Sequence, residues 1–443
     1  MPKKSRSSTV FVCEVCGEEY IQWQGRCNNC NNWNTLKEFK VAPVVAERGG
    51  GYSGETASAP ISLAAITGQA ESRTLSGFAE LDRVLGGGIV AGSVILLGGD
   101  PGIGKSTLLL QVVERMGSVS KNQILYISGE ESPEQIKLRA ERLGATASEV
   151  QILAATNIDH ITAVVEQLKP ALVIVDSIQT MYDPQFPSTP GSIVQVRECA
   201  VRIQHLAKRL GVPMVLVGHI TKEGTVAGPR TLEHLVDVVL YLEGEPQQQL
   251  RILRAVKNRF GDVTETGIFA MEGKGLVEVD NPGSFLLAER VQVPGSVLSA
   301  VIEGTRPMLI EVQALTTKSV FGYPRRTASG FDPNRLNLLL AVLERRAHID
   351  LSSHDVFVNI VGGLKVKDPA VDAAVCVALA SAFKDKVLAE NLCVIGEVGL
   401  AGEVRQVQQQ ERRAKEIKAL GYVLPPKEKS LAGMLSKLLA GRS

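Results

Sequence analysis

The feature that most constrains the fold is the segment Gly99–Ser106, which reads Gly-Asp-Pro-Gly-Ile-Gly-Lys-Ser and matches the pattern G-x-x-x-x-G-K-[ST] in full. An apolar strand is expected directly before it, at Val94–Leu97, and a helix directly after it, from Lys105. Glycines in such a loop let successive N–H groups surround phosphate oxygens, and the helix N-terminus adds partial positive charge. The segment therefore predicts a nucleoside triphosphate site, and its strand–loop–helix context argues against a chance glycine-rich turn.

Two side chains of this loop have expected roles. Lys105 is expected to reach the β- and γ-phosphates, and the Ser106 hydroxyl is expected to bind Mg²⁺. The predicted nucleotide-binding residues are Gly99, Asp100, Pro101, Gly102, Ile103, Gly104, Lys105, Ser106 and Thr107.

Around and after this loop, to about Leu276, apolar strands alternate with amphipathic helices. The strands are near-continuous apolar runs, typical of a parallel sheet covered on both faces, at Ile124–Ile127, Leu172–Val175 and Met214–Val217. One helix is expected from Ser132-Pro133 to Gly144 and another over Val194–Leu210, with Gly211 after it. Residues 73–280 are thus predicted to form one doubly wound α/β domain.

Carboxylates follow two of these strands. Asp176 ends the strand 172–175, as in a Walker B motif, and is the second expected Mg²⁺ ligand. Glu130 follows the strand 124–127 and is a candidate to polarise the water that attacks the γ-phosphate. Glu131 is better explained as an acid favoured at a helix N-terminus.

Four of the seven cysteines form two C-x₂-C pairs near the N-terminus. Cys13, Cys16, Cys27 and Cys30 are predicted to hold one tetrahedral Zn²⁺, which is structural because four thiolates leave no open coordination position. Residues 1–40 would form this knuckle. The stretch 41–72, rich in Gly, Pro and small residues, is expected to be a linker. The other thiols, Cys199, Cys376 and Cys393, are expected in apolar cores.

Length and charge restrict the remaining classes. A chain of 443 residues is expected to hold two or three domains. With 48 Lys+Arg against 47 Asp+Glu, a polycationic coat is excluded, although a local basic face is not. Apolar runs are much shorter than the roughly 20 residues of a membrane helix, so no membrane association and a cytoplasmic location are expected.

A break at Asn281-Pro282-Gly283 precedes a third segment, residues 281–443. Strands are expected there at 296–303, 309–314 and 356–360, and helices at 335–346 and 371–383. This mixture predicts an α+β domain.

Four segments, in order, resemble the bacterial RadA/Sms recombination and repair family: the Cys₄ knuckle, the P-loop, Lys257-Asn258-Arg259-Phe260-Gly261 and Gly396–Arg405. The resemblance covers nearly the whole chain. It implies a RecA-like ATPase core, related to hexameric DnaB-type helicase motors, followed by a domain like that of the Lon protease. It also implies that the chain forms a hexameric ring that acts as an ATP-driven motor on single-stranded and branched DNA. This motor would assist the RecA recombinase in strand exchange and branch migration.

The resemblance assigns residues as well. Glu130 matches a catalytic glutamate, and Lys257 and Arg259 match cations that act on nucleotide or DNA in the ring, so these join Lys105 and Asp176 as expected catalytic residues. The segments Tyr182–Arg197 and Gly224–Glu233 fall where RecA-like proteins place DNA-binding loops. The candidates for DNA contact are Lys222, Arg230, Arg325, Arg326 and Arg335, for which solvated surface arginines remain the alternative.

The chain departs from the Lon pattern at the nucleophile. Ala370 occupies the serine position in Asp368-Pro369-Ala370-Val371-Asp372, and Gln410-Glu411-Arg412-Arg413 lies near the expected lysine. Without a hydroxyl there is nothing to acylate, so peptidase activity is not expected. A KaiC-like regulatory ATPase remains the alternative, because it would share the core but would not require the knuckle or the Lon-like tail.

Overall fold

The computed structural model describes residues 8–13, 19–20, 22–29, 31–41, 73–119, 123–145, 150–219, 232–244, 249–287, 290–320, 322–362 and 364–440. The chain divides into two compact units, Met1–Glu243 with Ile252–Glu278 and Gly244–Arg251 with Val279–Ser443. Apart from Val41, the expected linker 41–72 lies outside the described residues. None of the helices in these ranges is long and apolar enough to cross a bilayer.

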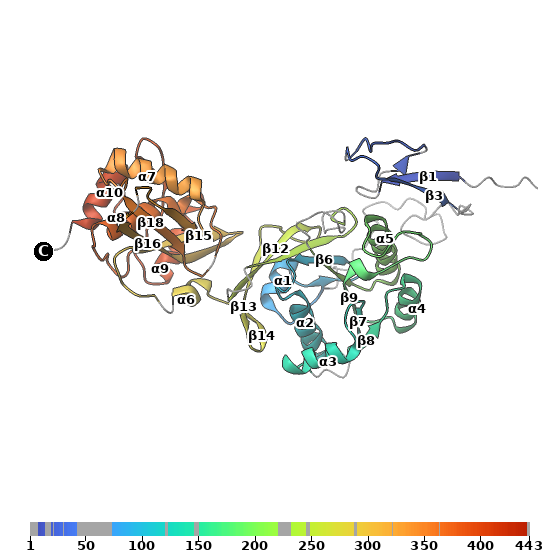
Figure 1. The fold of residues 1–443 in the computed structure, drawn as a ribbon. Helices are drawn as coiled ribbons and strands as arrows, with labels where there is room; N and C mark the ends of the chain where they lie inside the picture. Colours follow the sequence, from blue (N-terminus) through green and yellow to red (C-terminus); the bar gives the residue numbers. More distant parts are fainter. Residues whose placement is uncertain are drawn as a thin grey trace, which may run out of the picture. The chain divides into compact units, whose positions relative to one another are not determined.

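A nine-stranded sheet forms the centre of the first unit, in the order β14-β13-β12-β11-β6-β10-β9-β7-β8 (Figure 1). Neighbours from β11 to β8 run parallel. β12 runs antiparallel to β11, and β14 antiparallel to β13. The strands are β6 (Val94–Gly99), β7 (Ile124–Ser128), β8 (Val150–Ala154), β9 (Leu172–Asp176), β10 (Met214–His219), β11 (Val238–Glu243), β12 (Leu250–Asn258), β13 (Thr266–Glu272) and β14 (Gly275–Glu278). A separate pair is formed by β4 (Arg73–Thr74) and β5 (Ile89–Val90).

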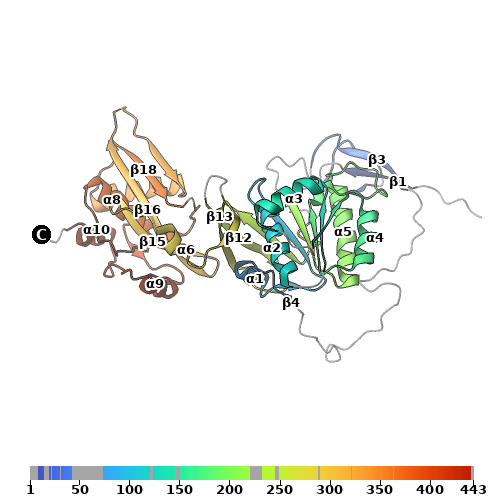
Figure 2. The same cartoon turned by 90° about the horizontal axis from the view of Figure 1, so that it is seen from below.

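Helices cover both faces of this sheet (Figure 2). α2 (Lys105–Val119) and α3 (Pro133–Arg142) lie on one face with α1 (Ala79–Leu85), and α4 (Ile158–Leu168) and α5 (Ile193–Leu210) lie on the other. Successive residues of β6 point to opposite sides, so Ile95 and Leu97 pack with α2 whereas Val94 and Leu96 pack with α5. The predicted doubly covered parallel sheet, the RecA-like arrangement of the core, is confirmed.

Local signals explain where the helices begin. Ser132 and Gln135 form a reciprocal capping box at α3, with Pro133 at the first helical position. Ser192 caps α5 by accepting a hydrogen bond from the Gln195 backbone. α5 therefore starts at Ile193, and the last residues of the segment 182–197, expected as a DNA-binding loop, are helical.

The N-terminal ribbon is a three-stranded antiparallel sheet of β1 (Ser8–Cys13), β2 (Glu19–Tyr20) and β3 (Leu36–Val41), in the order β2-β1-β3. Its described core is small: Cys13, Cys27 and Leu36 are buried together, with Phe11 and Tyr20 against them. So small a core is typical of a metal-stabilised segment.

The second unit contains a four-stranded sheet in the order β15-β16-β18-β17, in which only β17 and β18 pair in parallel. Its elements are α6 (Pro282–Leu287), β15 (Ser296–Glu303), β16 (Arg306–Lys318), β17 (Arg326–Ser329), α7 (Pro333–Ala347), β18 (His354–Ile360), α8 (Asp372–Phe383), β19 (Glu397–Val398), β20 (Val404–Arg405), α9 (Gln410–Ala419) and α10 (Leu431–Leu439). α8 is buried from Asp372 to Ser381.

The break expected at Asn281-Pro282-Gly283 coincides with the start of a helix. Pro282 opens α6, where a missing N–H is harmless, and the Asn281 side chain accepts from the Ser284 backbone at 3.0 Å. The same residue types that suggest a turn therefore cap a helix here.

Candidate active site

The phosphate-binding loop connects the end of β6 at Gly99 to the start of α2 at Lys105, as predicted. Gly102 and Gly104 have φ values of +74° and +115°, which side-chain-bearing residues rarely adopt. A Cβ on Gly104 would also lie 2.6 Å from the Met271 Cε atom. The backbone conformation thus favours glycine at position 104, whereas the Met271 methyl group, at the end of a flexible side chain, could shift.

Lys105 is buried within this loop. Its Nζ donates to the carbonyl oxygens of Gly99 at 2.8 Å and Asp100 at 3.0 Å. Burial lowers the pKa of Lys105, and the carboxylates of Asp176, Asp100 and Glu130 partly offset that effect. The ammonium group is therefore only partly compensated, and it is positioned to be stabilised by phosphate oxygens.

A cavity of about 310 Å³ lies at the carboxyl ends of β6, β7 and β9. Its wall includes Lys105, Ser106 and Thr107 from α2, Glu130 and Asp176 from strand ends, and Arg139 and Arg142 from α3. The structure thus brings together the residues predicted for phosphate, Mg²⁺ and water activation. A hydroxyl and a carboxylate are suitable oxygen ligands for Mg²⁺.

Hydrogen bonds hold the acids of this cavity. The Tyr126 hydroxyl donates to Asp176 Oδ2 at 2.5 Å, and Ser177 Oγ donates to Glu130 Oε1 at 2.6 Å. Glu131 instead forms an ion pair with Arg139. The two adjacent glutamates therefore have different surroundings, and their different roles stay predictions.

Sequence reasoning did not identify Tyr126, Ser177, Arg139 and Arg142. Arg139 and Arg142 are three residues apart on α3 and so share one helix face, which a search of the helix after Glu131 could have found. Tyr126 precedes the end of β7 by two residues and so lies on the same face as Ser128. Its contact with Asp176 depends on β7 pairing with β9.

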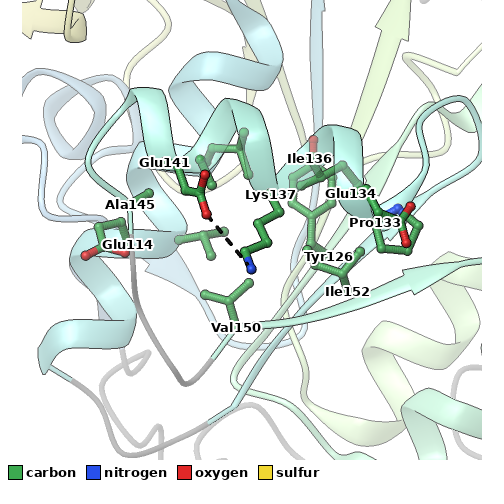
Figure 3. Close-up of a pocket in the computed structure, with 13 residues that line it drawn as sticks. Glu114, Tyr126, Pro133, Glu134, Ile136, Lys137, Glu141, Ala145, Val150 and Ile152 are labelled. Atoms are coloured by element: carbon green, nitrogen blue, oxygen red, sulfur yellow. Dashed lines mark ion pairs between the residues drawn. The ribbon is translucent and has the colours of Figure 1, made fainter.

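A second cavity of about 630 Å³ lies beneath α3, next to β7 and β8 (Figure 3). Tyr126, Ile136, Val150 and Ile152 line it, and Lys137 and Glu141 of α3 form an ion pair of 3.9 Å beside it. The ring of Tyr126 therefore faces an apolar cavity while its hydroxyl reaches the nucleotide site. Burial and the charge of Asp176 raise the pKa of Tyr126, which keeps the hydroxyl protonated as a donor.

The segment Lys257–Gly261 begins inside β12. Lys257 and Asn258 pair with Val239 and Val238 of β11, so the first two residues of the segment belong to the strand. The Asn258 side chain donates to the Val84 carbonyl at 3.1 Å and accepts from the Phe260 backbone at 2.9 Å. Asn258 therefore anchors the turn.

Gly261 completes that anchor. A Cβ on Gly261 would lie 2.9 Å from Gly86 Cα. Glycine is therefore needed for the close approach of the two backbones.

The two cations of this segment lie at the opposite end of the sheet from the phosphate-binding loop. Val238 of β11 is level with Ile95, near the start of β6, and Asn258 is level with Val238. Gly99 lies five positions after Val94 along β6, a distance of about 17 Å. Among the described residues, those lining the nucleotide cavity include neither Lys257 nor Arg259.

Each cation has partners at that end. Lys257 Nζ donates to the carbonyls of Glu233 at 2.6 Å and Val236 at 2.7 Å. Burial and the charge of Arg259 lower the pKa of Lys257. Arg259 Nη1 lies 3.2 Å from Asp237 Oδ1, and 53% of its side chain is exposed.

The described part of the predicted zinc site fits that metal. Cys13 and Cys27, one from each C-x₂-C pair, are fully buried in one cluster. The Tyr20 hydroxyl lies 3.3 Å from Cys27 Sγ, and the Cys13 Sγ lies 3.2 Å from Thr35 Oγ1. Cys16 and Cys30 lie outside the described residues. Buried sulfurs surrounded by hydroxyl groups are suitable ligands for a structural Zn²⁺.

The candidates for DNA contact are in different situations. Lys222 and Arg230 lie outside the described residues. Arg325 and Arg326 are exposed at the start of β17. Arg335 forms an ion pair with the buried Asp372 and donates to the Val398 carbonyl at 3.0 Å, so part of its charge is used within the domain. DNA contact by these arginines stays a prediction.

Two of the residues named for their departure from the Lon pattern, Ala370 and Arg413, are buried. Ala370 is fully buried, and Arg413, 3% exposed, forms an ion pair of 2.7 Å with Asp368. Arg413 also donates to the Ala300 carbonyl at 2.6 Å. Ala370 carries no hydroxyl and the Arg413 guanidinium is paired within the domain, and the absence of peptidase activity stays a prediction.

Comparison with known proteins agrees with this architecture. A model of the AAA domain matches residues 64–225, and a model of a rubredoxin metal binding domain matches residues 11–38. The DNA repair protein RadA of Bacillus subtilis is 48% identical over 421 residues, which cover 94% of this chain and 92% of that protein. The corresponding protein of Haemophilus influenzae is 46% identical over 419 residues, covering 94% of this chain and 91% of that protein.

The DNA repair protein RadA of Listeria monocytogenes is 46% identical over 421 residues, which cover 95% of this chain and 92% of that protein. The resemblance inferred from the motifs is confirmed. This chain belongs to the RadA family of DNA repair proteins.

Proposed function

We propose that this chain is a DNA-stimulated ATPase that acts as a hexameric ring-shaped motor on single-stranded and branched DNA, promoting strand exchange and branch migration with the RecA recombinase in the cytoplasm. The names of its relatives support a task in DNA repair. The P-loop and its acids support ATP hydrolysis with Mg²⁺.

The observation that carries the proposal is the position of Arg259. This half-exposed cation lies at the end of the sheet away from its own phosphate-binding loop. A ring, in which one subunit supplies a cation to the nucleotide of the next, gives such a residue a function. Cations supplied in this way accelerate phosphoryl transfer by about 10³- to 10⁵-fold. Lys257 and Arg259 would therefore be catalytic in trans.

Within one subunit, the residues have separate tasks. Lys105 would bind the β- and γ-phosphates, and Ser106 and Asp176 would hold Mg²⁺, which neutralises charge on the phosphates when bound. Glu130 would orient the attacking water and accept its proton, while the hydroxyl of Ser177 fixes one carboxylate oxygen. The P-loop residues from Gly99 to Thr107 would enclose the triphosphate.

DNA would contact the loop after β9. The buried side chain of Gln195 holds this loop in place by hydrogen bonds. Its Oε1 accepts from the Asp183 backbone at 2.7 Å, and its Nε2 donates to the carbonyls of Phe186 at 2.7 Å and Ser188 at 3.0 Å. An ordered loop loses less entropy when it binds a flexible strand. Lys222 and Arg230, with Arg325, Arg326 and Arg335 of the C-terminal unit, would bind phosphates. The C-terminal unit would have a Lon-like fold. The Zn²⁺ bound by the N-terminal ribbon would be structural.

Two measurements test the proposal. ATPase rates with and without single-stranded DNA separate a DNA motor, which is stimulated, from a KaiC-like regulatory ATPase, which is indifferent. In the second, Arg259→Ala chains are mixed with Lys105→Ala chains. Some interfaces then combine an intact P-loop with an intact cation, so activity should return in part. No recovery in demonstrably mixed rings would overturn the trans role.

A further inference from the structure

Asp237 lies at the centre of the contacts that hold Arg259. It is 1% exposed and directly precedes β11. Its Oδ1 pairs with Arg259 Nη1 at 3.2 Å, and its Oδ2 pairs with Lys208 Nζ of α5 at 2.8 Å. Its backbone carbonyl accepts from the Arg259 N–H at 3.2 Å. Asp237 therefore fixes both the main chain and the guanidinium of Arg259.

The same residue is attached to the strand that leads to the P-loop. Asp237 Oδ2 accepts from the Val94 N–H at 3.0 Å, and the Asp237 N–H donates to the Val94 carbonyl at 3.0 Å. Val94 is the first residue of β6. Two different functions are thus possible for Asp237: it orients Arg259 outwards, or it supports its own P-loop strand.

Charge favours the first function. Lys208, Lys257 and Arg259 gather around this one carboxylate, and Arg259 already lowers the pKa of Lys257. Without the negative charge of Asp237, these cations would repel each other. Of Lys208 and Arg259, which both pair with Asp237, Arg259 is the more exposed, so it is the one freer to move away. The backbone hydrogen bond to Val94, in contrast, needs only an oxygen acceptor, which an amide also provides.

We propose that Asp237 is a positioning residue that holds Arg259 in the orientation in which it reaches the nucleotide of the neighbouring subunit. The inference rests on the proposed trans function of Arg259. A displacement of about 1 Å at a reacting centre can cost 10²-fold in rate, so Asp237→Asn should lower DNA-stimulated turnover by about 100-fold. Binding of a non-hydrolysable ATP analogue should stay at the parent's affinity.

Mixing chains with complementary defects separates the two functions of Asp237. If it acts through Arg259, an Asp237→Asn chain keeps a working P-loop, so it recovers activity with Lys105→Ala and none with Arg259→Ala. If it supports its own P-loop strand, the pattern reverses: recovery occurs with Arg259→Ala and not with Lys105→Ala. The reversed pattern would overturn the proposal.

Controls distinguish failure of this inference from failure of the ring mechanism. Recovery by the Arg259→Ala and Lys105→Ala pair, with none by Asp237→Asn and Lys105→Ala, rejects only the positioning function. No recovery by the first pair rejects both. Lys208→Met removes the other cation from the same carboxylate and should keep the parent's turnover. Should Asp237→Asn not fold, Asp237→Glu keeps the charge but shifts it by one methylene, and it should show a smaller loss with the same mixing pattern.

Discussion

The hydroxyl of Tyr126 donates to Asp176 Oδ2 at 2.5 Å, across the boundary between β7 and β9. Tyr126 is 2% exposed, and its ring lines the apolar cavity beneath α3. A core side chain thereby orients the carboxylate that is expected to bind Mg²⁺. The Tyr126 hydroxyl stays protonated because burial and the charge of Asp176 both raise the pKa of Tyr126.

Tyr126→Phe tests that relationship, since the ring is kept and only the donor is lost. Partners that orient a metal ligand typically change metal affinity or activity by about 10–100-fold when removed. We expect the Mg²⁺ concentration for half-maximal ATPase to rise by a factor in that range, as measured by Mg²⁺ titration. Tyr422→Phe, which removes a half-buried hydroxyl from the other unit, should change nothing. An unaltered Mg²⁺ dependence in Tyr126→Phe would contradict an orienting function.

Lys105 should take up a proton when ATP binds at alkaline pH. Burial lowers its pKa in the free protein, and the triphosphate restores it by stabilising the charged form. At a pH alkaline enough to deprotonate part of the free protein at Lys105, the complex retains that proton. Calorimetric titrations in buffers of different ionisation enthalpy should show net proton uptake at this pH and less uptake at neutral pH. Equal enthalpies in all buffers at the higher pH would exclude this coupling.

The cysteines should fall into two reactivity classes. Burial raises the pKa of Cys199 to about 12 and that of Cys376 and Cys393 even further, so these three thiols stay neutral and unreactive in the folded protein. A strong chelator should therefore expose only the ribbon thiols to a maleimide, and metal analysis before chelation should find one zinc per chain.

Fluorescence provides an independent readout of that experiment. Both tryptophans, Trp23 and Trp33, belong to the ribbon, so an emission change on chelation reports that segment alone. Labelling of Cys199, Cys376 or Cys393 at the same rate would show that metal loss unfolds the core, contrary to this prediction. Cys27→Ala should lose the zinc and keep ATP-analogue binding.

The ion pair of Arg413 with Asp368 should matter for stability alone. Removing one partner of a buried pair typically costs about 3–5 kcal/mol, because the remaining charge lacks compensation. Arg413→Met should thus lower the unfolding temperature of the C-terminal unit in scanning calorimetry. Adding Asp368→Asn should recover part of the loss. Purely additive effects of the two substitutions on the unfolding temperature would show that Arg413 and Asp368 are not coupled. As a control, neither variant should alter ATP-analogue binding.

Local sequence patterns predicted the elements that depend on neighbouring residues. The P-loop lies between β6 and α2 because its glycines and the start of α2 are adjacent in the chain. Ser132, Gln135 and Gly211 mark helix ends through contacts within a few residues. At Asn281-Pro282-Gly283 the local signals are ambiguous, because Asn and Pro favour both turns and helix starts, and the structure shows a helix start there.

The sequence by itself therefore determined the P-loop, the parallel strands with Asp176 and Glu130 at their ends, and the family. Only the tertiary structure decided which distant side chains meet: Tyr126 with Asp176, Ser177 with Glu130, and Asp237 with Arg259. It also placed Arg259 at the end of the sheet away from the P-loop. These relationships depend on strand order and on the direction of β12, which are set by packing of the whole domain and leave no trace in local periodicity.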